Sequence, residues 1–169
     1  INPLTYYETV KYDSERLLLM VSSEKKIKLY ILRFAGIFGP GQINLQYGTN
    51  QFIKSVLKQK IIELWGKGEE LRDFVYVKDL AKLIADIVVG CPKEGVYNVV
   101  NGRSISFYDL TSKISKIIPR KFKLVSRKRT GTMFNQVFDN TKLKKFFPGF
   151  SFTDMAIGVK ETYESYFKK

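Results

Sequence analysis

Segments with strand character alternate with segments of helical character along this sequence, and this alternation limits the possible folds more than any other feature. Runs rich in β-branched and aromatic residues at 26–34, 61–65, 96–101 and 121–126 predict strands, and 71–77 also reads as extended. Helical patterns at about 6–22, 50–59, 79–90, 107–118, 142–147 and 154–167 separate or follow them. Strands that alternate with helices are typical of α/β proteins, so the sequence predicts an α/β fold.

The first helix has the clearest start signal. Thr5 and Glu8 have the spacing of a capping box, which places the first helical residue near Tyr6. An apolar stripe that we expect to be buried follows, formed by Val10, Leu17, Leu18 and Val21.

Other local signals predict caps and turns further along the chain. Ser106 is expected to cap the helix that Pro119 closes, Asp139 or Asn140 the helix that follows them, and Thr153 the last helix. Glycines and a proline at 36–42 predict a loop directly after the first strand.

Length and composition exclude several classes of protein. A chain of 169 residues can form an ordinary core, and its 44% hydrophobic content is globular. Cys91 is the single cysteine and histidine is absent, which argues against an internal disulfide, a zinc site or a histidine-based triad and favours a cytoplasmic location. No apolar run has the length of a membrane span, so no membrane partner is expected. Because the chain begins with Ile1 and helix signals follow at once, we expect a fragment of a longer protein.

The net charge of +13 indicates an anionic partner, either a nucleic acid or a small molecule. The basic residues are spread along the chain, and no RNA-binding aromatic signature, helix-turn-helix pattern or zinc finger accompanies them. We therefore expect no nucleic-acid partner. The short basic clusters could be ordinary solvated loops, or they could face an anionic small molecule.

Tyr7 and Lys11 stand four residues apart, so on a helix their side chains rise from neighbouring turns of one face. Such a pair suits proton transfer, because a phenol is a weak base near neutral pH and a neighbouring ammonium favours its phenolate form. The same spacing also arises by chance in a chain rich in tyrosine and lysine. The pair alone does not separate a catalytic site from an ordinary exposed helix face.

Five sequence blocks in order resemble the extended short-chain dehydrogenase/reductases, and within them the NAD-dependent nucleotide-sugar epimerase/dehydratase branch. The blocks are PLTYYETVKYDSE, ILRFAGIFGPGQ, LRDFVYVKDLA, VYNVVNG and RTGTMFNQVFDNTKLKKFFPGFSF, and they run from about Pro3 to the C-terminus. The resemblance covers the second half of such an enzyme. No glycine-rich dinucleotide loop follows a strand, and the family's upstream catalytic serine or threonine has no counterpart in this chain.

The resemblance implies a fold and a cofactor. It implies the C-terminal part of a Rossmann-type NAD(P)-binding sheet plus a small α/β substrate-binding domain. Residues 1–45 would be the tail of the cofactor domain and 46–169 mainly the substrate domain, with 72–101 returning to the Rossmann sheet. The cofactor would be NAD or NADP, the substrate a nucleotide-diphosphate sugar, and the full-length protein a homodimer. The fragment alone is expected to be inactive.

The resemblance also assigns roles to individual residues. Tyr7 and Lys11 match the catalytic pair and would also contact the cofactor, and Phe34 and Ala35 fall where the family's backbone approaches the nicotinamide. Arg72 and Arg129 match arginines on the nucleotide diphosphate, a role that suits the bidentate guanidinium. The alternatives are a salt bridge of Arg72 with Asp73 or Glu70 and an ordinary basic loop at Arg129. Arg33 is expected to be structural.

Two departures from the family pattern leave the sugar and the reaction open. Gly36 stands where many members have a substrate-contacting asparagine, and Lys78 replaces a frequent aspartate. Asn50 is a candidate for the missing polar contact. Two further readings stay open: a non-catalytic binding protein on the same scaffold, with an RNA-binding or regulatory role, and a non-catalytic NAD-binding assembly subunit.

Overall fold

The computed structural model describes residues 5–42, 48–58, 60–90 and 93–168. Its helices are α1 (Tyr6–Lys25), α2 (Thr49–Lys58), α3 (Val77–Gly90), α4 (Phe107–Ile117), α5 (Thr141–Phe146) and α6 (Met155–Ser165). Its strands are β1 (Tyr30–Phe34), β2 (Gly36–Phe38), β3 (Ile61–Trp65), β4 (Leu71–Arg72), β5 (Phe74–Tyr76), β6 (Gly95–Val99), β7 (Ile105–Ser106) and β8 (Lys123–Arg127). Helices and strands alternate, with most strand pairs parallel, and the α/β prediction is confirmed.

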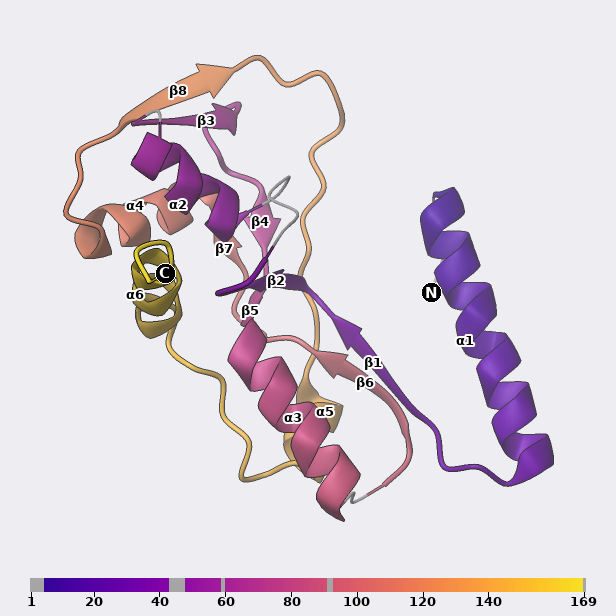
Figure 1. The fold of residues 1–169 in the computed structure, drawn as a ribbon. Helices are drawn as coiled ribbons and strands as arrows, with labels where there is room; N and C mark the ends of the chain where they lie inside the picture. The colour runs from indigo at the N-terminus through magenta and orange to yellow at the C-terminus, as the bar shows by residue number, and fades with distance from the viewer. Residues whose placement is uncertain (1–4, 43–47, 59, 91–92, 169) are drawn as a thin grey trace.

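Two parallel strand pairs lie at the base of the fold. β1 pairs with β6, from Tyr30 opposite Gly95 to Phe34 opposite Val99, and β2 pairs with β5. A single residue, Ala35, separates β1 from β2. Helix α3 carries the chain from β5, the partner of β2, to β6, the partner of β1. The carboxyl ends of β1 and β6 therefore lie side by side (Figure 1).

A first apolar core fixes this part of the molecule. It lies between the strands, α3 and α5, and consists of Val75, Leu80, Leu83, Tyr97, Val99, Leu143 and Phe147. Asp73 orders the chain that leaves β6: its fully buried carboxylate accepts hydrogen bonds from the amides of Asn101 (2.9 Å) and Gly102 (2.7 Å). The chain beyond the end of β6 is thereby held in place.

A second apolar core joins the other helices. It brings together α2, α4 and α6 with β3, and includes Ile53, Val56, Ile62, Leu110, Ile114 and Val159. Strands β3 and β8 pair in parallel above it, and β4 pairs antiparallel with β7 (Figure 1). Ser106 accepts a hydrogen bond from the Asp109 amide at 2.9 Å, so its predicted role as the cap of α4 is confirmed.

Three local predictions are wrong. Residues 36–38, predicted as loop, form β2, because pairing with β5 supplies backbone partners that no local pattern reveals. Thr153 does not cap α6. Its hydroxyl donates to Asp79, and Asp154 caps the helix by accepting from the Ala156 amide at 2.7 Å.

The third wrong prediction concerns the apolar stripe of α1. Val10, Leu17, Leu18 and Val21 are 63%, 61%, 50% and 41% exposed, and the helix buries no residue. Figure 1 shows α1 standing beside the β1–β6 pair with its outer side uncovered by any element that the structure describes. An amphipathic pattern selects the face that can be buried, but it does not supply the surface that buries it.

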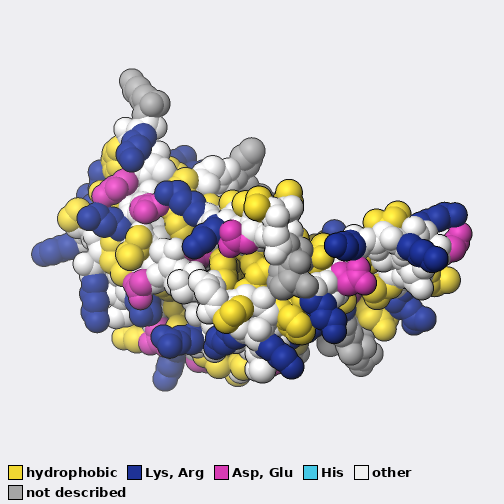
Figure 2. All heavy atoms as spheres, turned by 90° about the horizontal axis from the view of Figure 1, so that it is seen from below, with side chains coloured by type: hydrophobic (Ala, Val, Ile, Leu, Met, Phe, Trp, Pro, Cys, Tyr) yellow, Lys and Arg dark blue, Asp and Glu magenta, His cyan; other side chains and the backbone are white. Residues whose placement is uncertain are grey.

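The basic side chains are scattered on the face seen in Figure 2, with no single basic patch. No helix among the described residues is long and apolar enough to cross a membrane.

Candidate active site

The N-terminal turns of α1 present Tyr7 and Lys11 on one side of the helix. The predicted capping box is present: the Thr5 hydroxyl accepts from the Glu8 amide at 3.2 Å, and the Thr5 amide donates to the Glu8 carboxylate at 3.0 Å. The Lys11 ammonium lies 5.6 Å from the centroid of the Tyr7 ring, close enough for a cation–π contact. The Tyr7 side chain is 71% exposed, so its phenol can be reached from solvent.

A cavity of about 490 Å³ opens between α1 and the carboxyl ends of β1 and β6. Tyr7 and Lys11 line one side, and Phe34 and Ala35 line it from the end of β1. The structure thus brings four of the sequence-predicted site residues together. Their position agrees with the rule that ligands of open α/β sheets bind outside the carboxyl ends of the strands.

Five further lining residues had no role assigned from the sequence. Tyr12 and Glu15 lie on α1, Asn98 and Val100 at the end of β6, and Phe138 in the segment before α5. A signal for Asn98 and Val100 was available, because they lie at the end of the strand predicted at 96–101. Phe138 carried no such signal, since only the tertiary fold returns that segment to the cavity.

An ion pair joins α1 to β1 at the wall of the same cavity. Arg33 Nε donates to both carboxylate oxygens of Glu15, at 2.9 and 3.0 Å, and Arg33 Nη2 also binds Glu15. The Arg33 side chain is 33% exposed and the Glu15 side chain 18%. The hydrogen bond with Glu15 holds the pKa of Arg33 above its usual range. Arg33 therefore has the structural contact that the sequence analysis expected of it.

Arg72 and Arg129 converge on a different place, the carboxylate of Glu70. Arg72 Nη2 lies 2.7 Å from one oxygen of Glu70, and Arg129 Nη1 lies 3.1 Å from the other. A salt bridge with Glu70 is one of the two pairings named above as the alternative to phosphate binding by Arg72. The space between the two guanidiniums is occupied by Glu70, and neither arginine lines the cavity at Tyr7.

Glu70 is the electrostatic centre of that cluster. It is 8% exposed, and burial alone would raise its pKa. Hydrogen bonds from Arg72, Arg129 and the Phe134 amide outweigh this effect and hold the pKa of Glu70 below its usual range. Two guanidiniums on one carboxylate leave an excess of one positive charge at this point, which suits an anionic ligand.

Neither Asn50 nor Gly36 lines the cavity at Tyr7 or contacts the Glu70 cluster, although Gly36 directly follows Ala35. Asn50 is 2% exposed; its side-chain oxygen accepts from the Gly39 amide at 3.0 Å and its nitrogen donates to the Gly39 carbonyl at 2.8 Å. Both polar atoms are therefore occupied by a turn of the protein itself. Gly36 is exposed, and a Cβ there would come within 3.3 Å of the Asp73 carbonyl and the Phe74 ring.

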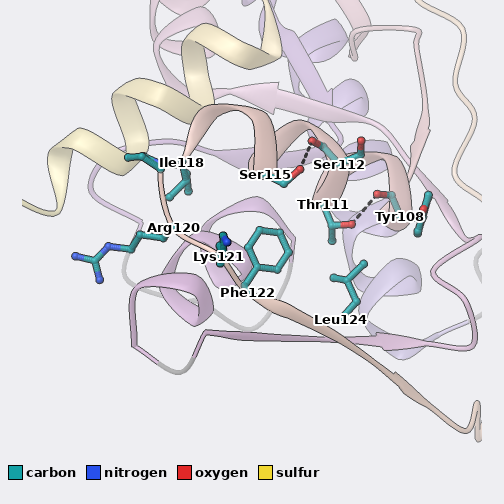
Figure 3. A pocket seen from close by; sticks show the side chains of 10 residues that line it. Tyr108, Thr111, Ser112, Ser115, Ile118, Arg120, Lys121, Phe122 and Leu124 are labelled. Carbon is teal, nitrogen blue, oxygen red and sulfur yellow. Dashed lines mark hydrogen bonds between the residues drawn. The ribbon is translucent and has the colours of Figure 1, made fainter.

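A larger cavity, of about 710 Å³, lies between α4 and β8 (Figure 3). The hydroxyls of Thr111 and Ser115 face it but donate to the carbonyls of Tyr108 (2.7 Å) and Ser112 (2.8 Å) within their own helix. None of the sequence-predicted site residues lines it. Its position gives it no part in chemistry at Tyr7.

The cavity at Tyr7 fits the nicotinamide end of a dinucleotide. It offers an ammonium for ribose hydroxyls and the 53% exposed ring of Phe34 as an apolar surface for a flat heterocycle. Lys11 and Phe34 would hold these parts of the cofactor, with Tyr7 beside them.

The fold is that of Rossmann-type nucleotide-sugar enzymes. UDP-glucose 4-epimerase from Thermotoga maritima, solved with UDP-glucose, superposes with a TM-score of 0.86 at 26% identity, over 98% of this chain and 54% of its own. Thermus thermophilus UDP-glucose 4-epimerase, solved with NAD, has a similar fold: the TM-score is 0.82 at 22% identity, over 98% of this chain and 55% of that one.

Sequence comparison then fixes the family. Residues 1–100 match the model of the NAD dependent epimerase/dehydratase family, and the chain belongs to that family. A protein of Bacillus subtilis (strain 168) described as an uncharacterized UDP-glucose epimerase, YtcB, is 31% identical over 148 residues, which are 86% of this chain and 46% of the relative. The expected family, fold and cofactor class, NAD or NADP, are confirmed. The chain spans about half the length of these relatives.

Proposed function

We propose that this chain supplies the acid/base and substrate-binding residues of an NAD(P)-dependent nucleotide-sugar epimerase or dehydratase. The observation that carries the proposal is the single cavity in which Tyr7 and Lys11 meet the end of β1. The family is NAD dependent, and similar proteins are epimerases of UDP-sugars. The proposal covers the whole protein, of which this chain matches about half.

In this proposal Tyr7 moves the proton. When bound, NAD(P) supplies the oxidant that takes hydride from a sugar carbon. The Tyr7 side-chain oxygen accepts the proton of the hydroxyl on that carbon and returns it later, with the Lys11 ammonium 5.6 Å from the centroid of the Tyr7 ring. Lys11 also binds ribose hydroxyls. The outcome would be epimerisation or dehydration if the hydride returns to the sugar, or reduction if the cofactor is supplied as NAD(P)H.

Arg72 and Arg129 are proposed to bind the diphosphate of the substrate. Their cluster with Glu70 carries excess positive charge, and a guanidinium can bind a phosphate in a bidentate manner. Glu70 would orient both groups. The other Nη atoms of Arg72 and Arg129 also bind backbone carbonyls, so the phosphate would be met by the Nε–H groups and the remaining Nη hydrogens. Gly36 remains a candidate for backbone contact with the substrate, whereas the contacts of Asn50 suit a structural role.

Two further properties stay predictions. The uncovered apolar face of α1, with Leu17, Leu18 and Val21, would be buried in a homodimer of the full-length protein or against other parts of it. A cytoplasmic location is favoured by the single cysteine.

The proposal is tested with Tyr7→Phe in the full-length protein, assayed with UDP-glucose and NAD and with other nucleotide sugars. We expect kcat to fall by about 10²–10⁴-fold, the usual scale of general acid–base catalysis, with little change in KM. Tyr6→Phe is the matched control, because Tyr6 is 95% exposed and does not line the cavity. Equal kcat values for the two variants would refute the role of Tyr7.

A further inference from the structure

The ion pair between Glu15 and Arg33 is placed where it can set the geometry of the candidate active site. Glu15 lies on α1 four residues after Lys11 and eight after Tyr7, and Arg33 lies on β1 directly before Phe34 and Ala35. Both charged residues line the cavity together with those four. The pair therefore links the element that carries the proton-transfer group to the element that forms the opposite wall.

The Glu15–Arg33 contact has more hydrogen bonds and is less exposed to solvent than an ordinary surface salt bridge. It combines three hydrogen bonds, and the Glu15 and Arg33 side chains are 18% and 33% exposed. Planar guanidinium–carboxylate contacts fix orientation as well as distance, whereas most exposed ion pairs contribute little. A helix rises about 1.5 Å per residue, so Glu15 lies about 12 Å along α1 from Tyr7. Because the helix is rigid over this length, a tilt of α1 at Glu15 displaces the Tyr7 side chain.

Within the described residues, α1 contributes no side chain to either apolar core and buries none of its residues. In this part of the protein its placement on β1 therefore depends on polar contacts such as the ion pair, whatever covers its apolar face in the full-length protein. Losing the ion pair would leave the cores around α2–α6 unchanged and would alter how α1 sits against β1.

We infer that Glu15 and Arg33 are positioning residues that hold the Tyr7 phenol at a fixed place relative to Phe34 and Ala35. The inference rests on the proposed function, because it assigns the pair a role in that same site. Neither residue transfers a proton. Their effect passes through the placement of α1, and catalysis is sensitive to displacements of about 1 Å, which can cost about 10²-fold in rate.

The first test measures kinetics in the full-length protein. Glu15→Gln is expected to lower kcat by about 10- to 100-fold while KM for the nucleotide sugar changes by less than about 3-fold. Arg33→Lys should retain part of the activity, since it keeps the charge but loses the fork. The double variant Glu15→Arg with Arg33→Glu should restore part of the kcat that either single charge reversal removes. Glu24→Gln is the control, because Glu24 is on the same helix but pairs with its neighbour Lys25.

The second test does not depend on activity. Spin labels at Asp13→Cys on α1 and Glu94→Cys before β6, both exposed positions, report the α1-to-sheet distance in the full-length protein after its native cysteines, Cys91 among them, are replaced by serine. We expect Glu15→Gln to broaden or shift the distance distribution and Glu24→Gln to leave it unchanged. An unchanged distribution with Glu15→Gln overturns the inference whatever the kinetics show. A changed distribution with a normal kcat for Glu15→Gln also overturns the inference, if Tyr7→Phe lowers kcat. If kcat is normal for Tyr7→Phe as well, the proposed function fails, and the positioning role in catalysis fails with it.

Discussion

Arg72 and Arg129 bind opposite oxygens of one carboxylate, so two residues 57 positions apart are held together by Glu70, at 2.7 and 3.1 Å. Arg72 also donates to the carbonyls of Leu71 (2.8 Å) and Phe134, and Arg129 lies 3.4 Å from the Trp65 carbonyl. The cluster thus ties β4 to the long segment that follows β8. It has a structural role whether or not it also meets a phosphate, and the two roles make different predictions.

The structural role predicts a pH dependence of stability. The pKa of Glu70 is lowered in the folded protein, so between that value and the ordinary glutamate pKa of about 4.3 the unfolded chain binds more protons than the folded one. The free energy of unfolding should therefore fall as the pH falls through this range. Glu70→Gln should lower stability by about 2 kcal/mol at pH 7, the scale of hydrogen bonds to charged groups, and by less near pH 3.

Urea unfolding at pH 7 and at pH 3 checks this expectation. Glu94→Gln, at an exposed glutamate, serves as the control and should have little effect at either pH. A Glu70→Gln deficit that is the same at both pH values would contradict the linkage.

The ligand-binding role predicts a loss of affinity in the full-length protein. Arg72→Ala should weaken nucleoside-diphosphate binding about 10- to 150-fold, because one charge-assisted contact contributes about 1.5–3 kcal/mol. The change should appear mainly in KM, and Arg72→Lys should recover part of it. Calorimetry with UDP measures the affinity. Arg127→Ala is the control, an exposed arginine paired with Glu63 at 2.9 Å, and equal affinities of the two alanine variants would exclude Arg72 from the site.

Asn50 should matter for stability rather than for substrate binding. Asn50→Ala removes both partners of the Gly39 peptide groups in a buried place, and each unsatisfied buried group costs about 1–3 kcal/mol. We expect a loss of about 2–4 kcal/mol in the free energy of unfolding. Asn50→Asp should lose less, because it keeps an acceptor for the Gly39 amide. Chemical denaturation of these variants, with exposed Gln51→Ala as the control, makes the measurement.

Gly158 in α6 should resist replacement. A Cβ at this position would lie 2.9 Å from two ring atoms of Phe38 and 3.1 Å from Tyr76, both of which are buried. Overpacking of this kind costs about 1–3 kcal/mol, which exceeds the gain of up to about 1 kcal/mol from replacing glycine in a helix.

The net expectation is that Gly158→Ala loses about 1–2 kcal/mol of stability. A Cβ added at Gly90, the last residue of α3, would meet no other part of the described structure within 4 Å, so Gly90→Ala should be neutral or slightly stabilising. Thermal unfolding of both variants compares them directly. A gain in stability for Gly158→Ala would contradict this expectation and show that α6 can move away from Phe38 on β2 and Tyr76 on β5 at no cost.

Much of the local structure was predictable from the sequence. The capping box at Thr5 and Glu8, the cap at Ser106 and the strand at 61–65 follow from signals within a few residues of each element. The pairing of Tyr7 with Lys11 on one helix face was predictable for the same reason, since it depends only on helical periodicity. The family resemblance was visible in the order of five short blocks.

Other features depended on partners distant in the sequence. Residues 36–38 form a strand because they pair with β5. Thr153 does not cap α6, because its amide donates a hydrogen bond to Asp79. The Asn50 amide binds Gly39, a contact that no local pattern indicated. Glu70 binds Arg72, two residues along the chain, and also Arg129, which the tertiary fold brings to it.

The sequence by itself determined the class of fold, the ends of most helices and the residue types of the candidate site, because propensity, capping and periodicity act over a few residues. Tertiary structure decided which of those residues share a cavity. It placed Phe34 and Ala35 in the same cavity as Tyr7, and it brought Arg33 and Glu15 together as an ion pair. It also directed Arg72 and Arg129 to one carboxylate, because such contacts depend on the packing of strands and helices that lie far apart in the chain.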